Sequence, residues 1–419
     1  MNLKSLSKLN IKNKTVLVRT DYNVPLKKRG TKYEVSEAKR IIDSLPVLNF
    51  LIKNQAKIIL MSHLGRPKGE PDPKLSLEPV AKYLKNKHSF SVKFVGETIG
   101  EKATQAAQEL QPGEILVLEN LRFQPEEKKN DKNFAKKLAS LADIYINEAF
   151  STCHRAHASI EAITHYLPSY AGPHLKNEVD NLSRIMEDPK HPFVMVIGGA
   201  KISTKIEAVQ NLHPIAEIVL VGGGVANNFL KAEGIETHKS ILEEDIEVKG
   251  KTITYLDLAR QIVEENKTER ILKDDYIPLP KILTPIDVVA ARSKDSTKTQ
   301  VIDLSSGMAD TPNDKDLQYL DIGPRTIKLF TDLLLRAKTI YWSGPLGVFE
   351  QKPFQQGTRE IARAIAKSSA ETFIGGGDTI AAVNQFGFAD RFDYVSSAGG
   401  AALEFLAGKK LPGLEALKS

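Results

Sequence analysis

Several features that would place a protein outside the cytoplasm are missing from this sequence. A single cysteine, Cys153, excludes an internal disulfide, so we expect a reducing, cytoplasmic environment. No uninterrupted apolar run approaches the ~20 residues of a membrane span, and the stretch 1–10 lacks the apolar core of a signal peptide. We therefore expect neither secretion nor membrane insertion.

Common nucleotide and metal motifs are missing as well. The segment GGAKISTK (198–205) does not fit the GxxxxGK[ST] pattern of a P-loop, and no GxGxxG pattern follows a predicted strand. No HxH or HExxH pattern indicates a protein-bound transition metal. A doubly wound dehydrogenase is therefore disfavoured, and a direct measurement of NADH binding would test it.

What the sequence does contain is a regular alternation of β-like and helix-like segments. Its 419 residues are enough for two domains of roughly 200 residues each. Short apolar runs that alternate with helical periodicity are typical of parallel, doubly wound α/β sheets. The predicted helices include 76–87, 131–142, 203–213, 326–338 and 357–369. The polar-faced stretch 173–192 is predicted to be a helix that connects the two domains.

In the first half of the chain, the apolar runs end in polar or charged residues. Asp21 and Asn23 follow the first run at alternate positions and present a carboxylate and an amide on one face. The other candidates of this half are Arg40, His63, Arg66, Arg122 and Arg155. Parallel sheets bind ligands at the carboxyl ends of their strands, so we expect these groups to converge on a small anion. Any one of these arginines alone could instead be a surface or structural ion pair.

Charge is distributed unevenly along the chain. Residues 1–172 carry 28 Lys and Arg against 18 Asp and Glu, whereas the remainder carries 30 against 34. A basic first half favours an acidic metabolite, and we interpret His63 as a hydrogen-bond donor to it. Basic runs such as 27–30 are predicted to be solvated. Since no basic stripe is interleaved with aromatic residues, nucleic acid is not an expected partner.

In the second half, the apolar runs end in glycine, which can present bare backbone N–H groups to a polyphosphate. Glycine clusters also serve tight turns and close packing, so the neighbouring charges matter. Lys201 and Lys205 are four residues apart, which predicts one shared face of a helix that opens directly after GGA (198–200). They would reach terminal phosphates there, although two solvated lysines are an equal alternative.

The segment GGGDT (375–379) is a sharper signal. Its glycines expose N–H groups, Asp378 can hold Mg²⁺, and Thr379 can cap the following helix or bind a phosphate oxygen. Glu350 could accept hydrogen bonds from ribose hydroxyls. An anion-binding half beside a polyphosphate-binding half indicates a two-lobed kinase.

At these positions the sequence resembles phosphoglycerate kinases over essentially its whole length. VLVRTDYNVP (16–25) is similar to that family's RxDxNxP signature. Further similar segments follow in order, namely SHLGRP, ENLRF, HRAHAS, GGAKISTK, LDIGP, GPLGVFE, GGGDT and AGGAALEFLAGKKLPGLEAL. The resemblance implies two Rossmann-like lobes with parallel doubly wound sheets, joined by a connecting helix. It also implies reversible phosphoryl transfer between MgATP and the carboxylate of 3-phosphoglycerate, giving 1,3-bisphosphoglycerate and MgADP, a glycolytic and gluconeogenic step.

The resemblance further implies domain boundaries. Residues 1–172 would bind 3-phosphoglycerate, 173–192 would form the interdomain helix and hinge, and 193–395 would bind the nucleotide. Residues 396–419 would pack back on the first domain. The chain is expected to act as a monomer whose lobes close when both ligands are present.

Residue roles follow from the same resemblance. Those implied for 3-phosphoglycerate are Asp21, Asn23, Arg40, His63, Arg66, Arg122 and Arg155. Those expected for the nucleotide are Lys205, Gly323, Glu350, Gly376, Gly377, Asp378 and Thr379, with Lys201 beside Lys205 and with Asp378 on Mg²⁺. Arg40, Lys205 and the amides around Gly376 would surround the phosphoryl group during transfer.

Several residues depart from the family pattern. Ser343 stands where Asn is usual and Ala398 where Gly is usual, while Glu148, Ser151 and Cys153 replace the common Asp, Gly and Ala. All the charged residues that the mechanism needs are present. A degenerate relative that binds ligands without catalysis is the alternative, and a coupled ATP-consumption assay distinguishes the two.

Overall fold

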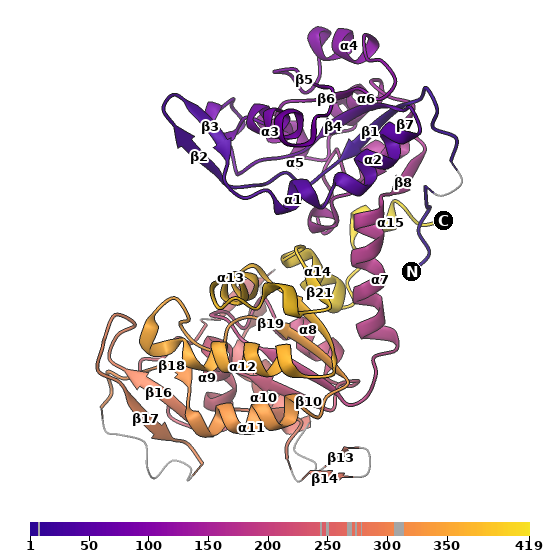
Figure 1. Ribbon diagram of the computed structural model, residues 1–419. Coiled ribbons are helices and arrows are strands. Elements are labelled where there is room, and N and C mark those ends of the chain that lie inside the picture. Colours follow the sequence, from indigo (N-terminus) through magenta and orange to yellow (C-terminus); the bar gives the residue numbers. More distant parts are fainter. Residues whose placement is uncertain are drawn as a thin grey trace. The chain divides into compact units, whose positions relative to one another are not determined.

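The structure, a computed structural model, describes residues 1–6, 9–243, 245–248, 251–265, 270–272, 275–277, 279–305 and 314–419. The chain forms two compact units (Figure 1). Unit 1 comprises Met1–Asn181 together with Lys410–Ser419, and unit 2 comprises Leu182–Lys409. The division falls within helix α7 (Pro173–Glu187). Among the helices described, none is both long and apolar enough to cross a bilayer.

Unit 1 is built around a parallel sheet with the strand order β5-β6-β4-β1-β7-β8. The strands of this unit are β1 (Thr15–Arg19), β2 (Leu26–Arg29), β3 (Lys32–Val35), β4 (Lys57–Met61), β5 (Val92–Phe94), β6 (Ile115–Val117), β7 (Ile144–Asn147) and β8 (Ser169–Ala171). Its helices are α1 (Lys39–Ile42), α2 (Leu45–Lys53), α3 (Glu78–His88), α4 (Glu101–Gln108), α5 (Pro125–Lys128), α6 (Lys132–Ala139) and α15 (Pro412–Glu415). The strands that follow β1 in the sequence, β4 to β6, lie on one side of it, whereas β7 and β8 lie on the other side. Open α/β sheets bind ligands where the strand order reverses in this way.

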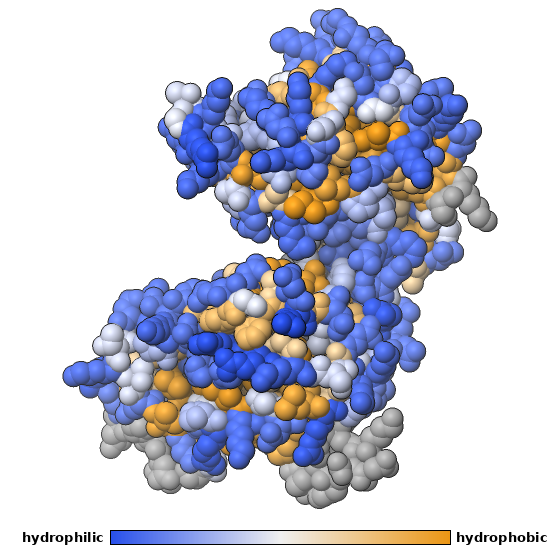
Figure 2. Space-filling view, viewed as in Figure 1, coloured by the Kyte–Doolittle hydropathy of each residue, from blue (hydrophilic) through white to orange (hydrophobic). Residues whose placement is uncertain are grey.

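Apolar residues cover both faces of this sheet, which explains why its strands read as continuous apolar runs. In β1, Val16 and Val18 pack into a core cluster with α2 and α3, whereas Leu17 packs into a second cluster with α4 and α6. Polar residues dominate the surface instead. The β2–β3 hairpin exposes residues 27–30, as predicted, and is hydrophilic in Figure 2.

Unit 2 contains a second parallel sheet with the order β15-β10-β9-β19-β20-β21. Its strands are β9 (Phe193–Ile197), β10 (Ile218–Val221), β15 (Ile282–Leu283), β19 (Thr339–Ser343), β20 (Glu371–Gly375) and β21 (Tyr394–Ser396). An antiparallel sheet of β16 (Asp287–Ala291), β17 (Gln300–Asp303) and β18 (Gln318–Ile322) was not predicted. Two short hairpins pair β11 (Ile246–Val248) with β12 (Lys251–Ile253) and β13 (Arg270–Leu272) with β14 (Asp275–Ile277).

The helices of unit 2 include three of the five helices predicted from the sequence. They are α8 (Ile206–Leu212), α9 (Gly223–Ala232), α10 (Tyr255–Glu265), α11 (Pro324–Leu334), α12 (Gln356–Lys367), α13 (Gly377–Gln385) and α14 (Gly400–Leu406). Four of the five helices predicted in both units, α3, α6, α11 and α12, differ by up to four residues at their ends. The fifth, α8, starts three residues later than predicted, with a consequence for two lysines described below.

The last ten residues belong to unit 1 and contact two of its segments. The N–H of Gly413 donates to the carbonyl oxygen of Cys153 at 2.9 Å, and the N–H of Lys4 donates to that of Leu417 at 3.1 Å. A Cβ on Gly413 would lie 2.9 Å from the Cα and Sγ of Cys153, so only glycine fits there. The chain end thereby packs against the loop that follows β7.

Candidate functional site

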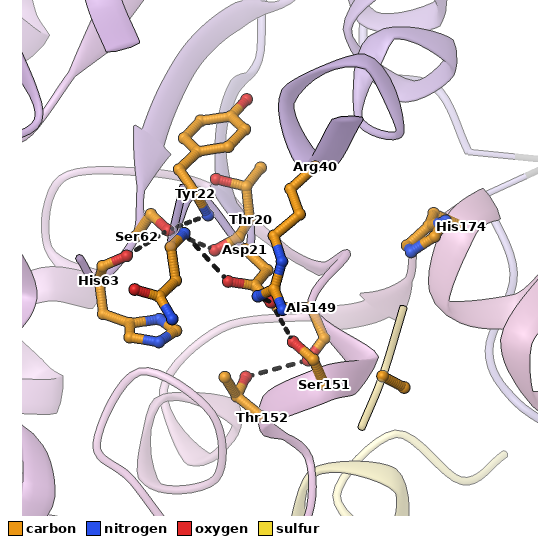
Figure 3. A network of polar contacts seen from close by, with 12 residues as sticks. Thr20, Asp21, Tyr22, Arg40, Ser62, His63, Ala149, Ser151, Thr152 and His174 are labelled. Carbon is orange, nitrogen blue, oxygen red and sulfur yellow. Dashed lines mark hydrogen bonds and ion pairs between the residues drawn. The ribbon is translucent and has the colours of Figure 1, made fainter. Parts of the chain in front are cut away.

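Three anion-binding candidates of unit 1, Asp21, Arg40 and His63, lie in one network of polar contacts together with Ser151 (Figure 3). Asp21 follows β1, and Arg40 extends from α1 so that its Nη1 donates to Oδ2 of Asp21. Ser151, in the short helix η3 (Phe150–Thr152) after β7, donates to the same oxygen. The side chain of Asp21 is 14% exposed and that of Arg40 is 33% exposed. One carboxylate is thus shared by a cation and a hydroxyl from two other elements.

Asp21 is held in its ionised form. Burial acts to raise its pKa, but the charge of His63 when that ring is protonated, the Arg40 guanidinium and the Ser151 hydroxyl act to lower it. The pKa of Asp21 therefore lies below its ordinary value. Burial, followed by the charges of Arg19 and Arg122, holds the pKa of His63 well below its usual range against the opposing effect of Asp21. His63 is therefore neutral near pH 7, and Arg40 is the lasting positive charge beside Asp21. The carboxylate can accept a hydrogen bond from a ligand hydroxyl.

His63 contacts a buried cation that the sequence analysis did not single out. Arg19 ends β1 with no exposed surface, and its Nη2 lies 3.2 Å from Nδ1 of His63. A guanidinium only donates, so Nδ1 accepts and the ring proton lies on Nε2. His63 can then donate through Nε2 to an anion.

A buried carboxylate balances Arg19. Nε of Arg19 donates to Oγ of Ser159 at 2.9 Å, and that hydroxyl donates to Glu127 at 2.7 Å. The N–H of Ser159 also donates to Glu127 at 3.0 Å, and Glu127 has no exposed surface. Burying a charge is costly unless it is paired, so this relay explains how an arginine can lie within the core. The signal in the sequence is a charged residue at the end of an apolar run.

Arg122 and Asn23 bind opposite sides of one residue, Gly65. Nη1 of Arg122 donates to the carbonyl oxygen of Gly65 at 2.7 Å, and Oδ1 of Asn23 accepts from its N–H at 2.8 Å. Arg122 lies in η2 (Leu121–Phe123) after β6 and is 5% exposed. Burial, with the charges of Arg19 and Arg155, lowers the pKa of Arg122 to about 10, so it remains a cation at neutral pH.

The structure brings five of the seven candidates into one contact network and leaves two at its surface. Arg66 and Arg155 have exposed side chains. Nε of Arg155 lies 3.0 Å from Nε2 of His154, and its charge acts on Arg122. The exposed guanidinium groups of Arg66 and Arg155 remain available to an anion that arrives from solvent.

In unit 2, several glycines at strand ends do not present free amides. The N–H groups of Gly198, Gly199, Gly222 and Gly223 donate to the carbonyl oxygens of Ser343, Pro345, Ile197 and Leu346, respectively. A Cβ on Gly198 would lie 2.2 Å from the carbonyl oxygen of Pro345. These glycines allow β9, β10 and the segment after β19 to approach closely. The expectation that they offer bare N–H groups to phosphate is therefore wrong.

The glycine segment after β20 is different. Gly376 adopts a φ of +94° and precedes α13, whose first backbone bond runs from Ile380 N–H to the Gly376 carbonyl at 3.1 Å. The N–H groups of residues 377–379 lie in the first turn, where a helix has no intrahelical acceptors. Together with the helix dipole, such amides attract an anion. Thr379 does not cap α13, since Gly376 is the N-cap residue, and its Oγ1 instead accepts from Gly344 N–H at 2.6 Å.

The two lysines after GGA do not share a helix face. Helix α8 begins at Ile206 with Lys205 as its N-cap residue, and Lys201 lies before an intervening turn with its side chain exposed. The N–H of Lys205 donates to the carbonyl oxygen of Ile202 at 2.8 Å, which forms a turn before the helix begins, so the predicted i,i+4 arrangement is wrong.

Lys205 is half-buried and close to the glycine segments. Its Nζ would lie 3.6 Å from a Cβ on Gly199. Burial lowers the pKa of Lys205, while the carboxylate of Asp378 in α13 acts to raise it. Lys205 therefore lies beside the N-terminus of α13.

The positions of Gly323 and Glu350 do not by themselves indicate a nucleotide contact. Gly323 is the N-cap residue of α11, where a Cβ would lie 2.3 Å from the carboxyl carbon of Asp287. That carboxylate accepts from the N–H groups of Arg325 at 3.0 Å and Thr326 at 2.8 Å. The glycine is thus required for the close approach of a capping carboxylate. Glu350 is exposed in a turn beyond β19.

A pocket in unit 2 was not anticipated from the sequence. Its lining is mainly apolar and includes Gly223, Asn227, Tyr319, Asp321 and Leu346. Burial raises the pKa of Asp321 to about 8, although the N–H of Gly357 donates to it at 2.7 Å. The lining comes from segments far apart in the sequence, so no local motif indicates it.

Comparisons with known proteins find similarity across both units. A family model described as phosphoglycerate kinase matches residues 6–409. The phosphoglycerate kinase of Pseudothermotoga lettingae is 42% identical over 414 residues, covering 99% of this chain and 98% of its own. That of Koribacter versatilis is 44% identical over 427 residues, covering 100% and 99%. The solved structure from Coxiella burnetii superimposes with a TM-score of 0.82 at 38% identity, covering 99% of this chain and 98% of its own. The structure from Pyrococcus horikoshii gives 0.80 at 31% identity with the same coverage.

Proposed function

The chain belongs to the phosphoglycerate kinase family, and on that premise we propose how its own residues carry the reaction. It is a glycolytic kinase, a phosphotransferase whose acceptor is a carboxyl group. The proposed acceptor is the carboxylate of 3-phosphoglycerate, bound by unit 1, and the proposed donor is MgATP, bound by unit 2. The reaction is reversible and yields 1,3-bisphosphoglycerate and MgADP.

The acceptor site rests on one observation, the Asp21–Arg40 pair flanked by His63 and Arg122 at the strand ends of unit 1. Asp21 accepts from the hydroxyl of 3-phosphoglycerate, and Asn23 assists. Arg122 and His63, with the exposed guanidinium groups of Arg66 and Arg155, bind its phosphate. Arg40 uses one of five N–H donors on Asp21 and directs others to the reacting carboxylate.

The donor site is proposed at the N-terminus of α13. The amides of Gly376, Gly377 and Asp378 bind the terminal phosphates, and Lys205 supplies a cation there, with exposed Lys201 nearby. Glu350 and Gly323 are the proposed contacts to the nucleoside. The helix dipole and a half-buried cation both favour a polyphosphate at this place.

Asp378 fits a role in holding Mg²⁺. Its carboxylate is exposed in the first turn of α13, next to the proposed phosphates, and its effect on Lys205 shows that the two lie close together. Mg²⁺ prefers one or two carboxylates together with substrate phosphate oxygens. When bound, the ion offsets phosphate charge. Lys205 and the α13 amides orient the phosphates from the protein side.

The chemistry needs no general base because the acceptor is already a carboxylate. Phosphoryl transfer depends chiefly on positioning and on stabilising the charge that moves. Arg40 serves the acceptor carboxylate in this way, and Lys205 with the Gly376 amide serves the transferred group.

A coupled ATP-consumption assay with the full chain tests this proposal. ATP should be consumed only when 3-phosphoglycerate is present, and the rate should saturate in both ligands. A folded chain that binds both ligands but consumes no ATP would favour the degenerate relative. Alternative nucleotides in the same assay determine the preference for the base.

A further inference from the structure

Ser151 is the one departure from the family pattern that contacts a proposed acceptor-site side chain directly. Its hydroxyl donates to Oδ2 of Asp21 at 2.5 Å, the oxygen that also receives Arg40 (Figure 3). Glycine, the residue usual at this position, has no donor to offer. The contact therefore depends on the hydroxyl of this serine.

The loop that carries Ser151 is fixed by its own polar contacts. The side-chain oxygen of Asn147 accepts from Ala149 N–H at 2.9 Å, and the hydroxyl of Thr152 donates to the Ala149 carbonyl oxygen at 2.9 Å. Phe150 is 1% exposed, and the carbonyl oxygen of Cys153 receives the C-terminal segment. A hydroxyl held by neighbours on both sides loses little additional freedom when it binds a partner.

We propose that Ser151 is a positioning residue, which fixes the Asp21 carboxylate for the acceptor and leaves most of the Arg40 donors for the acceptor's charge. The inference rests on the proposed function of unit 1. Two donors on Oδ2 fix the orientation of the Asp21 carboxylate. The other oxygen, Oδ1, accepts from Asn23 N–H at 3.2 Å. Without Ser151, Arg40 would be the only donor to Oδ2 of Asp21 among the contacts described.

The charge state of Asp21 provides a readout that a merely structural role would not move. The charged and titratable groups that act on the pKa of Asp21 are His63 after β4 and Arg40 from α1, and the hydrogen bonds from Ser151 and Asn23 also lower it. Arg122 after β6 is the further charge that interacts with Asp21. A hydrogen bond to the ionised form favours that form. Its removal should move the acid limb of kcat/KM for 3-phosphoglycerate to higher pH.

The experiment compares Ser151→Ala, Ser151→Gly and Ser151→Thr with the wild-type chain. A hydrogen bond to a charged group contributes enough to predict a rise in KM for 3-phosphoglycerate of about 5- to 10-fold in the Ala and Gly variants. Their kcat should remain within about twofold, and Ser151→Thr, which keeps the hydroxyl, should restore KM to within about twofold. Ser140→Ala is the matched control, because its exposed hydroxyl donates to the Lys137 carbonyl oxygen and should leave KM and the acid limb unchanged.

Each outcome decides the proposal. Unchanged KM and acid limb in both Ala and Gly variants would overturn it, as would a loss of kcat at constant KM. The melting temperature of each variant separates loss of folding from loss of positioning, and the Gly variant keeps the residue usual in relatives. If the wild type consumes no ATP, the proposed function fails, while calorimetric binding of 3-phosphoglycerate to wild type and Ser151→Ala still tests the positioning role.

Discussion

Removing the charge of Lys205 should reduce kcat by about 10²-fold or more. Its side chain is half-buried beside Gly199, where Nζ would lie 3.6 Å from an added Cβ. Burial lowers the pKa of Lys205, and the carboxylate of Asp378 acts against that shift. One preorganised donor aimed at charge that develops in a transition state contributes about 2.7–4 kcal/mol, or about 10²–10³ in rate.

The assay for Lys205 is steady-state kinetics with ATP and 3-phosphoglycerate both varied. Lys205→Ala removes the charge and the stem, whereas Lys205→Met keeps most of the apolar stem, so a loss common to both reports the charge. Lys338→Ala is the matched control, because this exposed lysine precedes β19 at the opposite end of the sheet. A kcat near the wild-type value in both Lys205 variants would refute the reasoning. A loss confined to KM for ATP would show that Lys205 serves ground-state binding only.

Three further predictions concern other residues. Arg122→Ala should raise KM for 3-phosphoglycerate about tenfold or more with kcat within a few-fold, because it would contact the end that does not react; a pure kcat effect would contradict this. Ser343→Asn should change KM for ATP by less than roughly tenfold, consistent with one hydrogen bond near Gly376, and a wild type that gains activity only with this change would favour the degenerate relative. Burial raises the pKa of Glu148 to about 8, against hydrogen bonds that include the N–H of His174. The stability that neutral Glu148 contributes is complete below the ordinary value of 4.5 and is lost as pH rises through about 8. The melting temperature should therefore fall between pH 5 and pH 8.5 by more in the wild type than in Glu148→Gln, and equal slopes would contradict the assignment.

The strands of the two parallel sheets could be predicted because burial on both faces leaves a plain signature. Continuous apolar runs such as that of β1 arise when successive residues pack into different clusters, as Val16 and Leu17 do. The antiparallel sheet of unit 2 has no comparable signature. Its pairing of β16 with β18 joins segments that lie further apart in the sequence and includes a shift of register between Val289 and Ala290.

Local spacing also misled where tertiary packing decides the backbone. Lys201 and Lys205 have the i,i+4 spacing of a helix, but a turn lies between them and α8 begins only at Ile206. The sequence predicts phosphate-binding amides at glycines 198, 199, 222 and 223. In the structure these glycines instead allow the strand ends to pack closely. Gly376, which has a positive φ, is instead followed directly by α13, whose first-turn amides have no acceptor within the helix.

The candidate site of unit 1 could be located from the sequence because position after a strand determines where a side chain lies in a parallel sheet. Asp21, His63 and Arg122 follow three strands whose ends meet at one edge. Arg19 was missed because it belongs to the strand itself, and its role needs the buried Glu127 relay to be recognised. Ser151 was noted only as a departure, since a single serine carries no signal until its partner is known.

The most direct test of the central claim is to detect the acyl phosphate that a carboxyl-directed kinase must form. The full chain is incubated with ATP, Mg²⁺ and 3-phosphoglycerate in the presence of hydroxylamine, which converts an acyl phosphate into a hydroxamate, and ADP is measured in parallel. We predict hydroxamate and ADP in equal amounts, both dependent on 3-phosphoglycerate and both reduced about 10²-fold in Lys205→Ala. ADP formation without hydroxamate, or no turnover by the folded chain, would contradict the account.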